Sequence, residues 1–436
     1  MKLTSIIFCL AAFAQPPIQK AIDYMAAASK DNAFMGTVLV ARDGKVLFSN
    51  GYGFANIEHG VPNAVDTKFR LGSLTKQFAA LAILQLEERG KLSVKDSMCN
   101  YIADCAEAWK PITIHHLLTH TSGLFNITND PELYEKKIML PARPLESLAK
   151  IKERQLRFPV GEKFEYSNSG YLALAAIVEK ASGTTWEAYI KKNVFDAAGM
   201  RDSGHDDHAT IIRNRASGYI GASNAPYHDM TIPIGAGDLY STVQDMLLWD
   251  QALYSEKLLK KQNIERMFTP EKNGYGYGWG ITRQHGKRLY SHSGGIHGFS
   301  TIISRFPEEK LLVVVLSNNM AQQTGNIGTA LAGIFLGLDI KPPSSRTAIT
   351  LSAESLEAFV GKYELAPTAV LTVTREGNQL SVQMTGQPAI PIFAESKNKF
   401  FLRVVDAQLT FDIDAAGKVT GVTLHQNGRN MPAKRQ

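Results

Sequence analysis

The chain has 436 residues, and this length predicts two or three structural units, the largest with a sizeable hydrophobic core. Its formal net charge of +6 is spread along the sequence and forms no basic run, which argues against the electrostatic footprint of a nucleic-acid-binding protein. No apolar run after the first residues is long enough to span a bilayer. We therefore expect a globular protein with no nucleic-acid partner and no membrane span.

The first 14 residues have the pattern of a secretory signal peptide. Lys2 supplies a positive start, Ile6–Phe13 are nearly all apolar, and Ala12-Phe13-Ala14 fits the small-x-small cleavage pattern. The alternative is a buried N-terminal helix, which Pro16 and Pro17 disfavour because they follow at once. The sequence predicts that residues 1–14 are removed and that the mature protein is periplasmic or secreted.

Cys99 and Cys105 remain once Cys9 is removed with the signal peptide. An exported compartment permits a disulfide between them. The sequence does not show whether their β-carbons face each other, so a disulfide and a pair of free, partly buried thiols both stay open. Neither cysteine has the His and Asn context of a nucleophile.

Patterns near the amino end predict a β-hairpin and then a long helix. Thr37–Ala41 and Val46–Phe48 are apolar or β-branched runs on either side of the turn signal Arg42-Asp43-Gly44-Lys45. Apolar residues then keep a helical spacing from Ser73 to Gly90. Ser73 is therefore expected at the start of a mostly buried helix.

The middle of the chain predicts helices, and strands return after it. Helical patterns occur at His115–Leu118, Gly170–Ala181 and Thr242–Leu253, and strand patterns at Ser300–Phe306 and Leu311–Leu316. Strands separated by a helical insert predict an antiparallel sheet assembled from both ends of the segment. The expected fold class is α/β in the α+β sense, with helices flanking this sheet and a mostly helical lobe beside it.

A second unit is predicted at the carboxyl end. Residues 341–351 include Lys341-Pro342-Pro343-Ser344-Ser345, a composition that favours an extended linker. Residues 352–436 are short alternating runs parted by Gly, Asn or Asp, as in a small up-and-down β-barrel. We expect residues 15–340 to form the main domain.

Ser73 and Lys76 form a Ser-x-x-Lys pair, one helical turn apart and close enough for a direct hydrogen bond. A helix N-terminus offers N–H groups to an oxyanion, and apolar neighbours lower the pKa of a lysine towards that of a useful base. The spacing alone proves little. It recurs at Ser147 with Lys150 and at Ser396 with Lys399.

Tyr166-Ser167-Asn168 lies in a predicted loop that leads into a helix. A tyrosine beside a cationic lysine is expected to be partly ionised and to pass a proton to the leaving group. The Asn168 amide is suited to hold both the lysine and a substrate carbonyl. Taken alone, the motif also fits a turn with a packed tyrosine.

His292-Ser293-Gly294-Gly295 precedes a predicted strand and is expected along the edge of a cleft. His292 is a candidate donor to a substrate carboxylate or carbonyl, and Gly294 lets substrate lie close. The N–H of Gly295 would pair with that of Ser73 as an oxyanion hole. A glycine-rich turn is the alternative.

These three elements together resemble the motifs of the penicillin-recognising serine hydrolases, the β-lactamase-related family close to class C β-lactamases, D-Ala-D-Ala carboxypeptidases, D-aminopeptidases and esterases. Further stretches typical of that family follow in the expected order and bring the resemblance to most of residues 30–320: Ile114–Leu124, Phe195–Ser203, Gly235–Asp245, Tyr275–Trp279 and Leu316–Asn318.

The resemblance implies a transpeptidase-like fold with the active site between its lobes, and an acyl-enzyme on Ser73. Lys76 and Tyr166 would move the proton, and Asn168, His292, Gly294 and Gly295 would bind substrate. It implies no cofactor and a small peptide, ester or β-lactam as substrate. The carboxyl-terminal segment resembles the lipocalin-like barrel that some members carry, with Phe359–Tyr363 as its opening.

His292 is a departure from the lysine usual at this position in β-lactamases of classes A and C. A histidine near its ordinary pKa carries part of a positive charge at neutral pH, so carboxylate recognition is expected to be weaker and pH dependent. This favours a peptidase, amidase or esterase, with D-amino-acid peptides among its candidate substrates. A true β-lactamase and a non-catalytic penicillin or muropeptide binder stay open as alternatives.

His116 and His120 have the spacing of metal ligands on a helix, and further His and Asp residues follow at 205–208. No Glu follows His116 as a metalloprotease requires. Because the stretch is already explained by the family pattern, no metal is expected.

Overall fold

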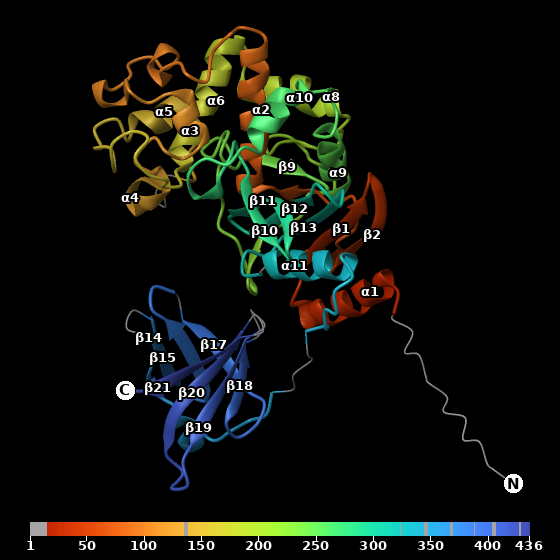
Figure 1. The fold of residues 1–436 in the computed structure, drawn as a ribbon, viewed down its shortest axis with the longest axis vertical. Coiled ribbons are helices and arrows are strands. Elements are labelled where there is room, and N and C mark those ends of the chain that lie inside the picture. Colours follow the sequence, from red (N-terminus) through yellow and green to blue (C-terminus); the bar gives the residue numbers. More distant parts are fainter. Residues whose placement is uncertain are drawn as a thin grey trace, which may run out of the picture.

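The computed structural model describes residues 15–134, 138–322, 324–343, 348–366, 369–387, 389–402, 407–426 and 429–436 (Figure 1). The predicted signal peptide, residues 1–14, lies outside the described residues. So do residues 344–347 of the predicted linker.

The centre of the molecule is an antiparallel sheet in the order β10-β11-β12-β13-β1-β2. The predicted hairpin forms its β1–β2 end, and Asp43 and Gly44 take the positive φ values, 50° and 75°, that a tight hairpin turn requires. The expected assembly from both ends of the segment is confirmed, since β1 pairs with β13. The strands are β1 (Gly36–Arg42), β2 (Lys45–Tyr52), β10 (Gly280–Gln284), β11 (Lys287–Ile296), β12 (Phe299–Phe306) and β13 (Leu311–Ser317).

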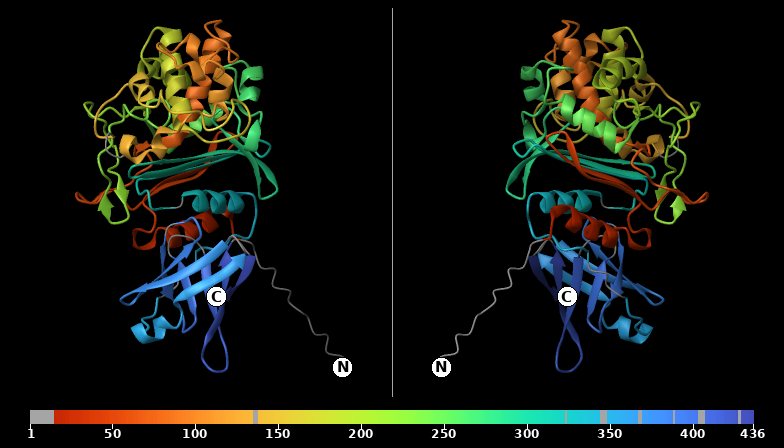
Figure 2. Two further views of the ribbon diagram at one scale, coloured as in Figure 1. Left: turned by 90° about the vertical axis from the view of Figure 1, so that its left-hand side faces the viewer. Right: turned by 90° about the vertical axis from the view of Figure 1, so that its right-hand side faces the viewer.

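Both faces of this sheet are covered, as the nearly continuous apolar runs of its central strands β1 and β13 require. Along β1, Leu39 and Ala41 join the core under the helical lobe, whereas Val38 and Val40 join a second core. That second core lies under α1 (Pro17–Ala28) and α11 (Thr324–Phe335), which pack against each other. Figure 2 shows these two helices as a layer on the side of the sheet away from the helical lobe.

The helical lobe is built around two buried helices, α2 (Thr75–Glu88) and α6 (Asn168–Ser182), which contact each other. Residues 75–86 of α2 are all buried, so this helix is apolar around most of its circumference and belongs inside a core. The other helices are α3 (Ile114–Leu118), α4 (Pro131–Tyr134), α5 (Pro144–Ala149), α7 (Trp186–Ile190), α8 (Asp196–Ala198), α9 (Val243–Ala252) and α10 (Lys261–Met267).

Short elements complete the main domain. The 3-10 turns are η1 (Lys30–Asn32), η2 (Gly72–Leu74), η3 (Met98–Asn100), η4 (Glu107–Trp109), η5 (Ile127–Asn129) and η7 (Lys272–Gly274), and η6 (Lys191–Phe195) is a π-helical turn. The short strands are β3 (Phe54–Asn56), β4 (Val61–Pro62), β5 (Phe69–Arg70), β6 (Gly204–His205), β7 (Tyr219–Ile220), β8 (Ser223–Asn224) and β9 (Leu239–Ser241).

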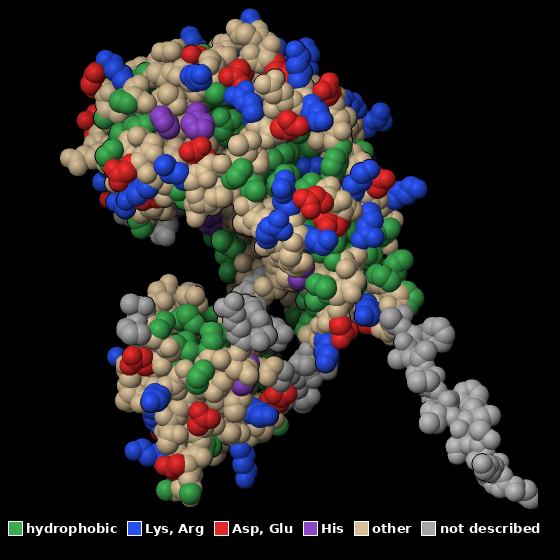
Figure 3. Space-filling model, in the orientation of Figure 1, with side chains coloured by type: hydrophobic (Ala, Val, Ile, Leu, Met, Phe, Trp, Pro, Cys, Tyr) green, Lys and Arg blue, Asp and Glu red, His purple; other side chains and the backbone are tan. Residues whose placement is uncertain are grey.

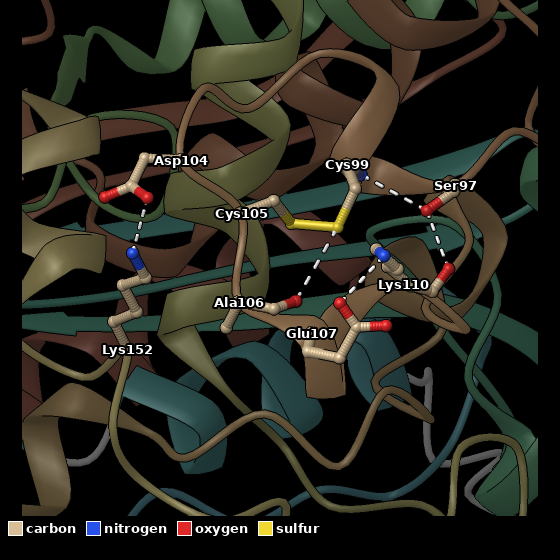
Figure 4. The surroundings of a disulfide bond; sticks show 8 residues. All are labelled: Ser97, Cys99, Asp104, Cys105, Ala106, Glu107, Lys110 and Lys152. Atoms are coloured by element: carbon tan, nitrogen blue, oxygen red, sulfur yellow. Dashed lines mark hydrogen bonds and ion pairs between the residues drawn. A yellow bond between two sulfur atoms is a disulfide. The ribbon is translucent and has the colours of Figure 1, made fainter.

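Cys99 and Cys105 are joined in a disulfide with 5.3 Å between their α-carbons (Figure 4). This decides between the two states that the sequence left open. The Ser97 hydroxyl donates to the Lys110 carbonyl at 2.7 Å beside the bridge. The disulfide therefore closes a short surface loop of the helical lobe at a point that hydrogen bonds already hold.

The carboxyl-terminal segment is a closed antiparallel barrel, β14 to β21, in chain order. It has its own core, which includes Tyr363, Phe400 and Phe411, and a short helix, α12 (Ala353–Glu357), precedes it. The strands are β14 (Gly361–Ala366), β15 (Ala369–Glu376), β16 (Gln379–Met384), β17 (Ile390–Ala394), β18 (Lys399–Leu402), β19 (Ala407–Ile413), β20 (Val419–Gln426) and β21 (Arg429–Arg435). The predicted barrel is confirmed, and the domain boundaries at residues 340 and 352 stay a prediction.

The surface carries both signs of charge in mixture. Figure 3 shows Lys and Arg side chains interspersed with Asp and Glu over the face in view, in both the main domain and the barrel. Within the part of the chain that the structure describes, no helix has the length and apolar content needed to cross a bilayer.

Helix α1 is an element that the sequence analysis did not predict. It begins at Pro17, directly after Pro16, where prolines were expected to stop a helix. Proline is unfavourable inside a helix but well suited to the first helical position, because its φ is already set and its missing N–H would have no partner there.

Deleting residues 345–436 is expected to leave a folded main domain, since among the described residues the barrel core and the main-domain cores have no member in common. Thermal unfolding followed by circular dichroism measures this. The truncated protein should melt cooperatively at the temperature of one transition of the full chain. A truncated chain that is insoluble, or soluble without a cooperative transition, would show that the barrel is integral to the main domain.

Candidate active site

Ser73 lies in η2, at the junction between β5 and the buried helix α2. Gly72 precedes it with φ of 55°, and a β-carbon on Gly72 would lie 2.9 Å from the backbone nitrogen of Gly295. Only glycine permits both this conformation and this approach. The turn that carries Ser73 is therefore packed directly against strand β11.

Lys76 is fully buried, and its amine contacts groups from distant parts of the chain. Its Nζ atom lies 3.0 Å from Ser73 Oγ, 2.8 Å from Asn168 Oδ1 and 2.8 Å from the Ala236 carbonyl oxygen. The same nitrogen lies 4.9 Å from the centre of the Tyr166 ring. The predicted contact between Ser73 and Lys76 is present, and it is one of several that fix the amine.

Burial lowers the pKa of Lys76 well below its usual value, because the charged form is taken out of water. The negative charge of Asp238 opposes this effect. A lysine of lowered pKa holds a larger share of free base at neutral pH, which is the form that accepts a proton. This agrees with the expectation that apolar neighbours lower the pKa of Lys76.

Tyr166 lies beside Ser73. Burial raises the pKa of Tyr166 well above its usual value, and the influence of the Ser73 side chain offsets this only in part. The expectation of a partly ionised tyrosine is therefore wrong for this structure. That expectation assumed a cationic lysine next to the ring, which would favour the ionised phenol. Burial instead pushes Lys76 towards its neutral form.

Asn168 is the first residue of α6, and its side chain bridges two parts of the site. Its Oδ1 accepts from Lys76, and its Nδ2 donates to Thr128 Oγ1 at 3.2 Å. Its backbone N–H donates to Asn126 Oδ1 at 3.1 Å. The amide is thus held in one orientation, with its oxygen on the lysine, as the sequence predicted for one of its two roles.

His292 is buried in β11 and bonded at both ring nitrogens. Its Nδ1 lies 2.6 Å from the Ser293 carbonyl oxygen, and its Nε2 lies 2.8 Å from the Tyr275 hydroxyl. The carbonyl can only accept, so Nδ1 carries the proton and Nε2 accepts from Tyr275. Burial, followed by the nearby Lys76, lowers the pKa of His292 to about 4. The expected partial positive charge at neutral pH is wrong, since desolvation removes it.

Gly294 and Gly295 face opposite sides of β11. A β-carbon on Gly294 would lie 2.1 Å from the Leu71 carbonyl oxygen and 2.2 Å from Thr301 Oγ1, so this glycine serves packing against η2. A β-carbon on Gly295 would meet nothing within 4 Å. Space for a substrate therefore opens at Gly295, and the expectation that Gly294 admits it is wrong.

A hollow of about 470 Å³, counted out to open solvent, lies over Ser73. Of the described residues that line it, none carries a charge, and Ser147 contributes a buried hydroxyl without a hydrogen-bond partner. Most of the wall is apolar. The lining residues are Ser73, Ile127, Thr128, Ser147, Asn168, Leu172, Ile232, Pro233, Ala236, Gly237, Gly295 and Ile296.

The spacing of His116 and His120 had suggested metal ligands. In the structure, His120 packs against the ring of Tyr166. Its ring is 4.2 Å from the Tyr166 ring, and its Nδ1 accepts from the backbone N–H of Ser167 at 3.1 Å. His116 Nδ1 accepts from the backbone N–H of Thr113 at 3.1 Å, as part of a helix cap. Among the described residues no group of three or more His, Cys, Asp or Glu side chains is placed to hold a metal ion.

Sequence reasoning missed His120 as a support of the tyrosine and Ala236 as a partner of Lys76. Both lie in stretches that had been noted, 114–124 and 235–245, but only as family patterns. A carbonyl has no signature in the sequence, so the Ala236 contact could not be found there. The unusual positive φ of His120, 56°, is likewise visible only in the structure.

Comparison with known proteins shows which family the chain resembles. The family model described as "Beta-lactamase" matches residues 22–333, and one described as a domain of unknown function, DUF3471, matches residues 345–435. The chain is 29% identical over 420 residues to penicillin-binding protein 4* of Bacillus subtilis, which covers 88% of this chain and 91% of that protein.

A second relative and a solved structure extend the likeness. The putative penicillin-binding protein PbpX of Bacillus subtilis is 32% identical over 315 residues, 71% of this chain and 75% of that protein. The octameric penicillin-binding protein homologue from Pyrococcus abyssi superposes with a TM-score of 0.68 at 25% identity, over 95% of this chain and 99% of that one. The chain belongs to the β-lactamase family and is a serine hydrolase of that family.

Proposed function

We propose that the protein cleaves amide or ester bonds through an acyl-enzyme formed on Ser73. The observation that carries this proposal is the contact between Lys76 Nζ and Ser73 Oγ at 3.0 Å, made by a lysine with no exposure to water. A serine hydroxyl is a weak nucleophile unless a base takes its proton. The buried amine is such a base.

The geometry around Lys76 fits its neutral form. A neutral amine has two N–H bonds and one lone pair, and the oxygens of Asn168 and Ala236, each at 2.8 Å, take the two N–H bonds. The lone pair is then left for the Ser73 hydroxyl. As Ser73 Oγ bonds to the substrate carbonyl carbon, its proton passes to Lys76 Nζ.

Tyr166 supplies the proton that the leaving group needs. Its phenol remains protonated at neutral pH because burial raises its pKa, and it lies beside Ser73. The phenol gives its proton to the leaving nitrogen or oxygen as the carbonyl bond to that atom breaks, and the proton held on Lys76 restores the phenol. Water then attacks the acyl carbon and returns Ser73 to its starting state by the reverse transfers.

The oxyanion is assigned to the backbone N–H groups of Ser73 and Gly295. The packing of Gly72 against the Gly295 nitrogen brings the two segments together, and Gly295 borders the hollow over Ser73. Backbone donors that are fixed before the reaction stabilise a developing negative charge without reorganisation.

The hollow favours an uncharged, largely apolar acyl group as substrate. No charged side chain is among its described lining residues, and His292 is neutral at physiological pH. A neutral His292 does not attract a substrate carboxylate. The proposal therefore no longer favours substrates that would depend on this attraction, such as a β-lactam or a peptide with a free carboxyl group. An amide or ester with an apolar acyl group, including that of an N-acylated D-amino acid, remains the favoured substrate class.

Export from the cytoplasm is part of the same proposal. The disulfide between Cys99 and Cys105 belongs to an oxidising compartment, and the first 14 residues have the pattern of a signal peptide. These features support a periplasmic or secreted location.

Ser73→Ala is expected to abolish hydrolysis and covalent labelling by a fluorophosphonate probe, because no acyl-enzyme can form. Ser396→Ala is the matched control, since Ser396 also stands three residues before a lysine but lies in the barrel. Labelling of intact protein is read by mass spectrometry. Label retained in Ser73→Ala would overturn the assignment of the nucleophile.

Lys76→Ala and Tyr166→Phe should each lower kcat/KM by about 10² to 10⁴, the usual size of a proton-transfer contribution. In the wild-type enzyme kcat/KM should rise with pH through the lowered pKa of Lys76, since only the free amine accepts the Ser73 proton. Steady-state rates on a p-nitrophenyl ester, with circular dichroism as a check of folding, measure both effects. Near-normal rates in the two variants would place the proton path elsewhere.

The preference for a neutral over a carboxylated substrate should not change between about pH 5.5 and 9. His292 is neutral throughout this range, because its pKa lies at about 4 and its charged form appears only as pH falls through that value. The ratio of kcat/KM for an amide and its carboxylated analogue tests this, with His292→Gln as a non-titrating control. A ratio that follows a pKa between 6 and 7 in the wild type and is flat in the variant would restore the charged histidine.

A further inference from the structure

Asp238 is a buried carboxylate near the active site that the catalytic scheme above does not use. It has no exposure to solvent and stands directly before β9. Its Oδ1 accepts from the backbone N–H of Gly235 at 2.7 Å, and its Oδ2 accepts from Trp186 Nε1 and His205 Nδ1, both at 2.8 Å. A group surrounded in this way by N–H donors suits a carboxylate, since a carboxylic acid would need an acceptor.

The bond from Gly235 to Asp238 closes a turn that carries a contact of Lys76. Ala236, inside this turn, presents the carbonyl oxygen that lies 2.8 Å from Lys76 Nζ. Next to the turn, the backbone N–H of Leu239 donates to Thr75 Oγ1 at 3.3 Å, which ties it to helix α2. Gly235 has φ of 76°, a left-handed backbone conformation that favours glycine. The bond from its N–H to Asp238 fixes this conformation. Asp238 thus holds the turn in the conformation that aims the carbonyl at the lysine.

Asp238 also acts on Lys76 through its charge. Among the described groups that face the amine, the Ser73 hydroxyl, Asn168, Tyr166 and Tyr171 carry no charge, and neither do His120 and His292, whose pKa values burial lowers. The carboxylate of Asp238 opposes the effect of burial on the amine. In a region of low dielectric such a charge acts strongly over several ångströms.

His205 is the counter-charge of Asp238. Burial lowers the pKa of His205, but the hydrogen bond and charge of Asp238, with Glu187 and Asp206, outweigh it and the pKa is raised. His205 is one of the residues of β6, which pairs with β9 beside Asp238. Asp206 is itself held by Arg70 and Arg215, each at 2.5 Å, so its charge is compensated. The protonated form of His205 is therefore the one that answers Asp238 directly.

We propose that Asp238 is a positioning residue of the active site, which fixes the Ala236 carbonyl on the Lys76 amine and supplies a buried negative charge that His205 balances. This inference rests on the proposed role of Lys76 as the base. The two changes Asp238→Asn and His205→Gln remove opposite charges from one pair. They should therefore shift the titration of Lys76 in opposite directions, which a purely structural role would not do.

The titration of Lys76 can be measured without reference to catalysis. NMR of the full chain labelled with ¹³C at lysine Cε follows the amine directly, and the spectrum of Lys76→Ala identifies its signal. Relative to the wild type, Asp238→Asn should titrate at lower pH, because a negative charge that favours the ammonium form is lost. His205→Gln should titrate at higher pH, because Asp238 is left uncompensated while Gln still donates to it.

Asp245→Asn is the matched control. Asp245 is also buried and accepts from the backbone N–H of Asp202 and the hydroxyl of Ser203, both outside the turn that carries Ala236. Its loss should lower stability and leave the Lys76 titration where it is. Unchanged titration in both Asp238→Asn and His205→Gln, or shifts in the same direction, would overturn the proposal.

The pH dependence of kcat/KM gives a second readout. Its acid limb should move in the same directions as the NMR titration, and Asp238→Asn should also lose about tenfold to 10²-fold at the plateau, because the turn that aims Ala236 is disturbed. If Lys76→Ala kept normal activity, the proposed function would fail while the NMR result would still decide the role of Asp238. Opposite NMR shifts without movement of the acid limb would show that Asp238 sets the charge of Lys76 but that Lys76 is not the base.

Discussion

Removal of the Lys76 amine from water is the constraint on which the rest of the site depends. A lone buried amine is costly, so it must find acceptors inside the protein. They come from Asn168 at the start of α6 and from Ala236 in the turn before β9, far away in sequence. The contact between α2 and α6 in the helical lobe brings the first of them within reach. The fold thus serves the site by converging distant segments on one nitrogen.

The groups around the amine form a layer that burial keeps uncharged. His120 packs against the rings of Tyr166 and Tyr275, at 4.2 Å and 4.8 Å, and Tyr275 donates to His292. Burial raises the pKa of the tyrosines and lowers that of the histidines. Without competing charges, the few dipoles and the one carboxylate that remain act at close to full strength on the reacting atoms.

Local patterns in the sequence predicted much of the fold and the identity of the central residues. The hairpin at 37–48 and the helix after Ser73 depend on turn residues and apolar spacing, which are local. The charge states of Tyr166 and His292 were predicted wrongly because they depend on burial by residues distant in sequence. Asp238 was missed for the same reason, since its partners Trp186 and His205 are more than thirty positions away.

The two glycines of β11, Gly294 and Gly295, show that the register of a strand decides which residues face the interior and which face the open side. Successive side chains of a strand point to opposite faces, so His292 and Gly294 share one face and Ser293 and Gly295 share the other. In a glycine-rich segment no apolar alternation reveals which face is buried. In the observed register Gly294 lies opposite Thr301 of β12. The face of His292 and Gly294 is therefore turned inward, against Tyr275 and Leu71. The imidazole is thereby committed to the interior, and what β11 presents on its open face is the backbone at Gly295.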